Sequence, residues 1–145
     1  MEDPNNPCLF CNIKKSGCAH ENDLAYASYD SYPVSNHHCL IIPKRHVRDY
    51  FEMTNDELIS CDELIKIVKV EILNKDQSVK GFNIGTNIGK VSGQSILHCH
   101  IHIIPRREGD VENPQGGVRS VIPNKQHYKR KKKAVIKDKL PRVSG

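Results

Sequence analysis

The sequence predicts an α+β fold, and three observations support this prediction. Short runs of β-branched and apolar residues, which are typical of strands, lie in both halves of the chain. Between them lies one long segment whose apolar residues recur at the spacing of an amphipathic helix. The length of 145 residues suits one compact domain with a hydrophobic core of its own. This order of strands and helix is typical of α+β domains.

The first half of the chain is predicted to hold two strands behind an irregular arm. Residues 1–20 form this arm, which is rich in Pro, Asn and Gly. Residues 24–29 and 38–43 are rich in strand-forming side chains. The turn-rich residues 30–37 separate the two runs, so we expect them to pair with each other.

A helix is predicted to follow, with a clear signal at its start. Thr54 can cap the helix, and Glu57, three residues later, completes a capping box. The apolar residues at helical spacing are Leu58, Cys61, Leu64, Ile65, Val68 and Ile72. We therefore expect this helix to lie with one face on the sheet.

Two further strands are predicted over residues 80–86 and 96–105, and the second contains three histidines at a spacing of two. Because side chains alternate between the faces of a strand, His98, His100 and His102 should project from one face. The other face should carry residues that pack in the core: Leu97, Cys99, Ile101 and Ile103. Three imidazoles on one face indicate a metal cluster or nucleophilic phosphorus chemistry, and the alternative is a satisfied polar edge strand.

A glycine-rich stretch leads directly into the histidines. Gly89 and Gly93 allow backbone amides to turn toward a ligand, and Gln94 and Ser95 add neutral donors that suit phosphate oxygens. Such residues are common in turns. Beside an imidazole row they indicate an oxyanion cradle for a histidine nucleophile.

Six cysteines are present, and two of them are spaced as a pair. The start of the chain has no charged and apolar leader, and no apolar run is long enough to cross a membrane. We therefore expect a cytoplasmic protein with reduced cysteines. Cys8 and Cys11 form a Cys-x-x-Cys segment, which indicates a metal knuckle or a redox pair.

The net charge of +5 comes from the C-terminal end of the chain. Residues 129–142 contain eight of the 22 basic residues and one of the 17 acidic residues. We expect residues 129–145 to be a solvated, flexible tail. The alternative is a salt-sensitive contact with nucleic acid or polyphosphate.

Two sequence blocks resemble a known family. Residues 93–106, Gly-Gln-Ser-Ile-Leu-His-Cys-His-Ile-His-Ile-Ile-Pro-Arg, resemble the active-site signature of the histidine triad (HIT) superfamily of nucleotide hydrolases and transferases. Residues 30–46, which end in Pro-Lys-Arg-His, are similar to the first half of that family. The resemblance spans residues 8–123. One departure is visible, because Asn36 and His37 stand where the family usually has Pro-Gly or a similar pair.

The resemblance implies a HIT domain over residues 1–128, with a five-stranded antiparallel sheet and helices on one side of it. It also implies a homodimer, since members of the family commonly pair across two such sheets. In zinc-carrying branches of the family, a Cys-x-x-Cys joins two histidines at one ion. Carried over residue by residue, this implies a structural zinc site formed by Cys8, Cys11, His46 and His98.

The resemblance also implies the catalytic residues. His100, the middle histidine, would attack an α-phosphorus and form a nucleotidyl-histidine that water then breaks. His102 would contact the scissile phosphate and pass a proton to the leaving group. His38 would brace one of these two rings by a hydrogen bond.

The substrate is expected to be held by five residues. Asp30 would accept hydrogen bonds from both ribose hydroxyls, with a turn-capping role as the alternative. Gln94 and Ser95 would hold non-bridging phosphate oxygens, and Asn87 would point toward the phosphate or the sugar. Arg106 suits a distal phosphate chain.

The predicted function is therefore that of a nucleotide hydrolase acting through a nucleotidyl-histidine, with diadenosine tetraphosphate or a related dinucleoside polyphosphate as the favoured substrate. Nucleoside phosphoramidase and nucleotide phosphorylase activities are alternatives within the same family. A zinc-stabilised adaptor that binds nucleotide or RNA without turnover is the alternative of another class. Nucleic acid as a partner through the basic tail is not favoured, and no membrane partner is expected.

Overall fold

The structure is a computed structural model, and it describes residues 7–12 and 18–130. The chain divides into two compact units, Met1–Glu112 and Asn113–Gly145. All the predicted site residues belong to the first unit. Residues 131–145, which make up most of the predicted tail, lie outside the described residues.

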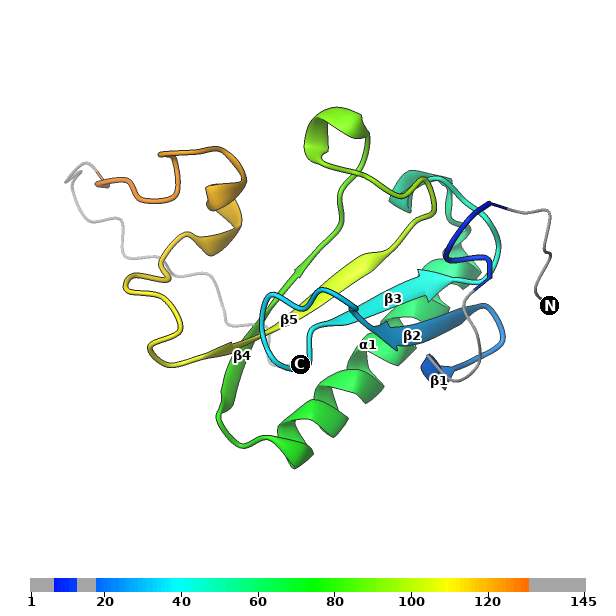
Figure 1. Ribbon diagram of the computed structural model, residues 1–145, viewed down its shortest axis with the longest axis horizontal. Coiled ribbons are helices and arrows are strands. Elements are labelled where there is room, and N and C mark those ends of the chain that lie inside the picture. Colours follow the sequence, from blue (N-terminus) through cyan, green and yellow to red (C-terminus); the bar gives the residue numbers. More distant parts are fainter. Residues whose placement is uncertain (1–6, 13–17, 131–145) are drawn as a thin grey trace, which may run out of the picture. The chain divides into compact units, whose positions relative to one another are not determined.

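The first unit is built on a five-stranded sheet in which every paired neighbour is antiparallel. The strands are β1 (Cys18–Glu21), β2 (Ala25–Tyr29), β3 (Cys39–Pro43), β4 (Val79–Gly85) and β5 (Ile101–Arg107). Their order across the sheet is β1-β2-β3-β5-β4, as Figure 1 shows. The central strands β3 and β5 therefore lie side by side although a helix and β4 separate them in the sequence. The predicted α+β fold and five-stranded antiparallel sheet are confirmed.

Strand β1 was not expected from the sequence, because it lies at the end of the segment assigned to the irregular arm. It is four residues long and pairs with β2 only. The register shifts between Cys18 and His20, which is an irregularity of the kind common in edge strands. A strand this short has no room for an alternating pattern, so its pairing with β2 defines it rather than its own composition.

The long helix α1 (Asn55–Lys75) starts where the sequence predicts. The Thr54 side chain accepts from the Glu57 backbone amide at 3.1 Å, and a Glu57 carboxylate oxygen accepts from the Thr54 amide at 2.9 Å. This reciprocal pair satisfies two amide groups that the first turn leaves free. The helix buries Cys61, Leu64, Val68 and Ile72 and runs across one face of the sheet, where it contacts β2 and β3 (Figure 1).

Among the described residues α1 is the one long helix, and the other helical segments are short 3-10 turns. These turns are Tyr50–Glu52, Lys90–Ser92 and Gly117–Val121. The expectation of helices on one side of the sheet is therefore met by a single main helix. The described chain places no long helix over the opposite face.

Both faces of β3 are buried, and each face joins a different apolar cluster. Cys39 and Ile41 belong to the main core between the sheet and α1. Leu40 and Ile42 face the other way and pack with Phe10 and Tyr26 in a smaller cluster. Burying one large aliphatic side chain contributes about 1.5–3 kcal/mol, so the second cluster helps to hold the segment around Phe10 on the open face of the sheet. Two of the predicted site residues, His98 and His100, contact Phe10 of this cluster.

Candidate functional site

Only one of the three histidines lies within a strand. Strand β5 begins at Ile101, so His98 and His100 belong to the loop before it, and the prediction of a strand from residue 96 is wrong. The ladder between β3 and β5 covers Cys39–Ile41 and Ile101–Ile103. It ends there because Pro43 has no amide hydrogen, and its carbonyl accepts from the His98 ring instead.

The predicted alternation of side chains also fails in this loop at one position. Cys99, Ile101 and Ile103 are buried in the main core as expected. Leu97 is 57 % exposed, although the sequence pattern predicts that it packs inside. The cause is local, because the Cys99 amide donates to Val47 O at 2.8 Å and the chain before it follows the loop rather than the sheet.

The histidines nevertheless form one continuous row of rings. Ring centroids lie 4.9 Å apart for His46 and His98, and 5.2 Å apart for His100 and His102. His38 extends the row, with its centroid 5.2 Å from that of His102. Phe10, which the sequence pattern did not single out, lies between His98 and His100. The centroid of its ring lies 6.1 Å from that of His98 and 5.0 Å from that of His100.

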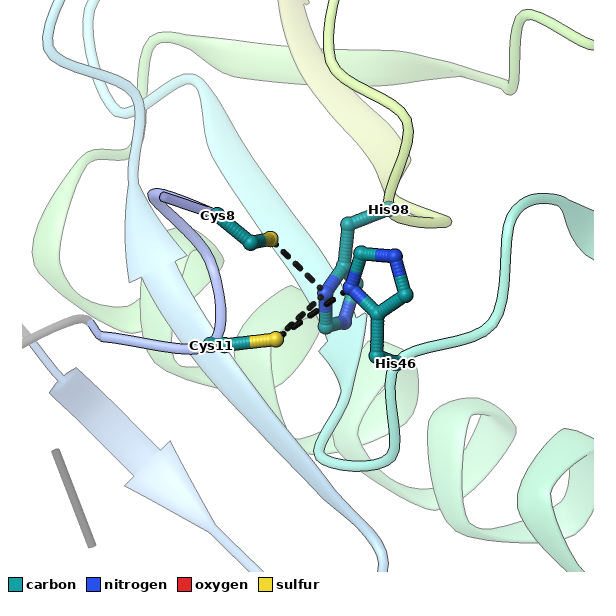
Figure 2. Close-up of side chains that lie close together, drawn as sticks. All are labelled: Cys8, Cys11, His46 and His98. Atoms are coloured by element: carbon teal, nitrogen blue, oxygen red, sulfur yellow. Dashed lines mark hydrogen bonds between the residues drawn. The ribbon is translucent and has the colours of Figure 1, made fainter. Parts of the chain in front are cut away.

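One end of the row forms a cluster of metal-ligand atoms with Cys8 and Cys11. Cys8 Sγ lies 3.3 Å from His98 Nδ1, and Cys11 Sγ lies 3.2 Å from His46 Nδ1 and 3.4 Å from His98 Nδ1. Figure 2 shows the four side chains pointing toward one another from three separate segments. The four ligand atoms all lie within 4.8 Å of one another. Sulfur and nitrogen ligands of a tetrahedral zinc ion lie about 3.5 Å apart, so the cluster has the dimensions of a metal site.

The chemical state of His98 also suits a metal ligand. Its Nε2 donates to Pro43 O at 2.7 Å, which leaves the lone pair of Nδ1 directed at the two sulfur atoms. Burial lowers the pKa of His98, so the ring is neutral at pH 7. A metal ligand that donates its second ring hydrogen to a carbonyl has a fixed orientation.

His100 is held in one tautomer by the backbone. Its Nδ1 donates to the His98 carbonyl at 2.8 Å, so the proton lies on Nδ1 and the lone pair on Nε2. The side chain is 7 % exposed. Within the part of the chain that the structure describes, no residue forms a hydrogen bond with this Nε2. In the neutral ring the lone pair of the middle histidine therefore lies on Nε2, and a nucleophile requires such a lone pair.

The far end of the row is a relay of hydrogen bonds. The Val34 amide can only donate, so Nδ1 of His38, 3.2 Å away, is an acceptor and Nε2 carries the proton. That Nε2 donates to His102 Nδ1 at 2.9 Å, which leaves the His102 proton on its own Nε2. Burial lowers the pKa of both His38 and His102, so both rings are neutral at pH 7.

Asp30 lies beside this relay with one oxygen engaged in a turn. Its Oδ1 accepts from the Tyr32 amide at 2.8 Å, and its Oδ2 lies 3.5 Å from His38 Nε2. The ligand atoms of Asp30, His38 and His102 are close enough to suggest a second metal site. The tautomer argues against it, because His38 Nε2 holds its proton while Nδ1 accepts from Val34. Both roles considered for Asp30, turn cap and acceptor for a ligand, are compatible with this geometry.

Gln94 is already fully engaged by the backbone around it. Its Nε2 donates to Arg48 O at 2.6 Å and to Ile96 O at 3.1 Å, and its Oε1 accepts from the Gly89 amide at 2.9 Å. In this structure both hydrogens of the Gln94 amide are donated to the backbone, and its predicted contact with phosphate stays a prediction. Gln94 shapes the loop that precedes the histidines.

Two other polar side chains of the loop region before β5, Ser95 and Asn87, have polar groups that can bind a ligand. Ser95 is exposed, and its hydroxyl forms no hydrogen bond with the residues that the structure describes. Asn87 is half-buried, and its side-chain amide is likewise not hydrogen-bonded to any described residue. The positive φ angles of Gly89 (86°) and Gly93 (93°) turn the loop between them.

Arg106 is likewise hydrogen-bonded to neighbouring side chains, and its predicted contact with a distal phosphate chain stays a prediction. Its Nε and Nη2 donate to the two carboxylate oxygens of Asp110 at 2.7 and 2.9 Å, and its Nη1 donates to Asn83 Oδ1 at 2.7 Å. Hydrogen bonds from Arg106 lower the pKa of Asp110 well below its usual range, so the pair is ionised at pH 7. A guanidinium neutralised in this way is a poor ligand for a distal phosphate chain.

Comparison with known proteins now identifies the class of protein. Residues 14–109 match the model of the HIT domain family, and the chain belongs to this family. An uncharacterized HIT-like protein of Methanocaldococcus jannaschii is 41% identical over 111 residues, which are 72% of this chain and 83% of that protein. The predicted family membership is thus confirmed.

Two relatives with named activities and two solved structures are also similar. Adenylylsulfatase HINT3 of Arabidopsis thaliana is 36% identical over 109 residues (72% of this chain, 55% of that protein). Adenosine 5'-monophosphoramidase hnt1 of Schizosaccharomyces pombe is 33% identical over 103 residues, which are 68% of this chain and 74% of that protein. A hypothetical histidine triad nucleotide-binding protein of Sulfolobus tokodaii superposes with a TM-score of 0.65 at 38% identity, covering 71% of each chain. A Zn-bound histidine triad family protein of Mycobacterium smegmatis superposes with a TM-score of 0.64 at 26% identity, covering 72% of this chain and 78% of that chain.

The residues that the structure describes contain no helix both long and apolar enough to cross a membrane.

Proposed function

We propose that this HIT-family nucleotide hydrolase cleaves its substrate at the α-phosphorus by way of a covalent intermediate on His100. The observation that carries the proposal is the hydrogen bond from His100 Nδ1 to the His98 carbonyl, which directs the lone pair of Nε2 away from the backbone. A neutral imidazole with this tautomer is a competent nucleophile at pH 7. Attack forms the phosphorus–nitrogen bond and breaks the bond to the leaving group.

His102 is proposed to hold the scissile phosphate by a hydrogen bond. The relay from the Val34 amide through His38 leaves the neutral His102 ring with its proton on Nε2, which can donate a hydrogen bond to a phosphate oxygen but is too weak an acid to be given up. The leaving group takes its proton from a water molecule, and the hydroxide that remains displaces His100 from phosphorus. Hydrolysis then releases the nucleotide and returns both rings to their starting state.

Three side chains and a set of backbone amides are proposed to bind the nucleotide. Ser95 and Asn87 offer uncommitted polar groups in the loops before β5, and we propose that they contact the phosphate oxygens or the sugar. Asp30 keeps acceptor positions for the two ribose hydroxyls, since a carboxylate has more acceptor sites than its turn uses. In place of the Gln94 side chain, the amides of the loop that Gln94 holds are the proposed phosphate donors.

A structural zinc ion is proposed at Cys8, Cys11, His46 and His98. Two thiolates and two imidazoles are a donor set that zinc prefers, and four protein donors leave no open position for substrate. When bound, the ion supplies a fixed link between the N-terminal segment and the sheet. The similarity to the Zn-bound histidine triad family protein of Mycobacterium smegmatis supports this assignment.

The substrate class that we now favour is an adenosine 5'-monophosphate unit joined to a small leaving group. The neutralised Arg106 argues against a long phosphate chain at that position. The two relatives with named activities are an adenosine monophosphoramidase and an adenylylsulfatase, neither named for a dinucleoside polyphosphate. Diadenosine tetraphosphate, the substrate favoured by the sequence alone, becomes the comparison substrate.

A homodimer is proposed to form along β4. Among the described residues this strand pairs with β5 alone and forms one edge of the sheet, so its outer side can pair with a strand of a second chain. An apolar cavity of about 460 Å³ lies beside it, lined among others by Tyr50, Ile59 and Ile84, which are all exposed. A second copy would cover this apolar surface and continue the sheet.

Rates on three substrates test the proposed function: adenosine phosphoramidate, adenylyl sulfate and diadenosine tetraphosphate. We expect kcat/KM to be at least about tenfold higher for a substrate with a small leaving group. The His100→Ala variant should bind adenosine monophosphate but turn over none of the three. A rate that increases with added phosphate would assign phosphorolysis, and RNA retention without any turnover would replace the proposal by a binding role.

A further inference from the structure

Phe10 connects the metal-site segment to the proposed nucleophile. It lies between Cys8 and Cys11 in the sequence and is only 6 % exposed. Its ring meets the His100 ring at an interplanar angle of 68° with centroids 5.0 Å apart. The same ring also lies against His98, with centroids 6.1 Å apart. Aromatic rings at such distances and angles attract each other beyond simple burial.

The position of Phe10 is fixed by its own backbone and by the sheet below it. The Tyr26 hydroxyl donates to Phe10 O at 2.6 Å, and burial raises the pKa of Tyr26 well above its ordinary value, so this donor is retained. The Asn12 side chain donates to Cys8 O at 2.9 Å, and the Asn12 amide donates to Leu9 O at 3.2 Å. These bonds hold the segment in a turn that directs Phe10 inward.

His98 provides a second connection between the same two sites. Its ring faces Cys8 and Cys11 through Nδ1, while its backbone carbonyl accepts the Nδ1 proton of His100 at 2.8 Å. The side chain of His98 therefore contacts the metal-site segment, and its backbone contacts the proposed nucleophile. The ring of His100 is therefore constrained on one edge by His98 and on another side by Phe10.

We propose that the Cys8–Cys11 segment positions the nucleophile, with Phe10 and His98 holding the His100 ring in the orientation and tautomer that attack requires. Phe10 is a positioning residue in this proposal, since it acts through His100. The proposal rests on the proposed function in one respect, which is that His100 is the nucleophile. Its structural part, that the segment sets the state of the His100 ring, is independent of turnover.

The chemical reason for such a device is the geometry of attack. A ring nitrogen must approach phosphorus opposite the leaving group, and a displacement of about 1 Å can cost about 100-fold in rate. His100 lies in the loop before β5, where no ladder hydrogen bonds fix it. Contacts with Phe10 and with the His98 carbonyl supply the constraint that the strand does not.

The matched variants for testing this proposal are Phe10→Ala and Leu9→Ala. Both residues lie between the same two cysteines, but Leu9 is 61 % exposed and has no aromatic ring. A third variant, Phe10→Leu, keeps apolar volume and removes only the aromatic ring. Each is prepared with zinc, and zinc content and melting temperature are measured first.

The decisive readout is the tautomer of His100 by long-range proton–nitrogen NMR, with its signal assigned from its loss in His100→Asn. We expect wild type and Leu9→Ala to show a single tautomer with the proton on Nδ1. Phe10→Ala should show averaged tautomers and a kcat reduced about tenfold at unchanged KM, with Phe10→Leu between the two. Removal of zinc from the wild type by a chelator should give the same averaging.

Several outcomes would overturn the proposal. One is a single His100 tautomer and full kcat in Phe10→Ala, and another is a rise in KM alone, which would place Phe10 against the substrate instead. If Phe10→Ala binds no zinc, Phe10→Leu decides by the same criteria. If the wild type turns over no nucleotide, the proposed function fails, while the NMR result still decides whether the segment positions His100.

Discussion

Nε2 of His38 lies 2.9 Å from Nδ1 of His102, and this contact fixes the proton on both imidazoles. His38 ends the turn before β3, and His102 lies in β5, so the pairing of the two central strands brings them together. The Val34 amide completes the relay at the other side of His38. The hydrogen-bond donor that His102 offers in the proposed mechanism therefore depends on His38, 64 residues away in the sequence.

Replacing the middle of this relay should weaken the hydrogen bond from His102 to the substrate. We expect His38→Phe, which keeps a ring but removes both hydrogen bonds, to lower kcat by about 10- to 100-fold, because the proton of His102 is then no longer held on Nε2. The loss should be similar for different leaving groups, since His102 donates to the phosphate that they share. His127→Phe, at an exposed histidine of the second unit, is the control. An unchanged kcat in His38→Phe, or a loss confined to one kind of leaving group, would contradict the role given to His102.

The same histidines predict how stability depends on pH. Burial lowers the pKa of His38 and His102 below the ordinary value of 6.5, so the unfolded chain binds more protons than the folded chain just below that pH. Stability should therefore be fully present above about pH 6.5 and decrease as the pH falls toward the folded-state pKa values. Melting temperatures between about pH 5 and pH 8 measure this. His38→Phe should show a shallower decrease than wild type, and an equal decrease would count against the assignment.

The metal site predicts a stoichiometry and a stability. Purified protein should contain about one zinc per chain, and Cys8→Ser should lose it together with several degrees of melting temperature. Cys18→Ser is the matched control, because Cys18 is also half-buried and close in sequence but donates to His20 O at 3.0 Å. Mass spectrometry measures the zinc content of each variant, and calorimetry measures its melting temperature. Well under one zinc per chain in wild type would remove the proposed site.

Arg106 predicts a substitution that leaves small substrates unaffected. Because its guanidinium is bound to Asp110 and Asn83, Arg106→Gln should lower the melting temperature slightly and change kcat/KM on adenosine phosphoramidate by less than about twofold. Steady-state kinetics on the phosphoramidate and on diadenosine tetraphosphate measure this. A selective rise in KM for the dinucleotide would restore the role in distal phosphate binding that the sequence suggests.

His37 occupies a backbone conformation that favours glycine. Its φ angle is 73°, and it stands where the family usually has a Pro-Gly or similar pair. His37→Gly should relieve about 1 kcal/mol of backbone strain, offset in part by loss of the 3.3 Å contact with Asp76. His37→Val should destabilise the protein, since a β-branched residue fits this region poorly. Unfolding in denaturant measures both, and a His37→Val variant as stable as wild type would contradict this interpretation.

Local signals and the family resemblance predicted different parts of this molecule. The capping box of Thr54 and Glu57 is a local signal, so the start of α1 could be predicted from four consecutive residues. The metal cluster joins Cys8 to His98 across 90 residues, and the resemblance rather than the spacing brought these residues together. The strand β1 carried no signal of its own, because its pairing with β2 defines it.

The hydrogen bonds of Gln94 and Arg106 could not be predicted from the sequence, and one physical reason explains both. Gln94 and Arg106 have the chemistry of phosphate ligands, and no sequence pattern indicates that Arg48 O and Asp110 engage them first. Phe10 was overlooked for the opposite reason, since an apolar residue inside a Cys-x-x-Cys pair carries no chemical signal. Its contact with His100 forms only when the segment folds onto the sheet.

The central claim is that Nε2 of His100 bonds covalently to phosphorus, and rapid quenching tests it most directly. Protein mixed with adenosine phosphoramidate is denatured within one turnover under alkaline conditions and digested for mass spectrometry. We predict an acid-labile adduct of one adenylyl group on the peptide that contains His100, absent in His100→Asn. Substrate consumed at the normal rate with no adduct at any time, or with an adduct on another residue, would contradict this mechanism.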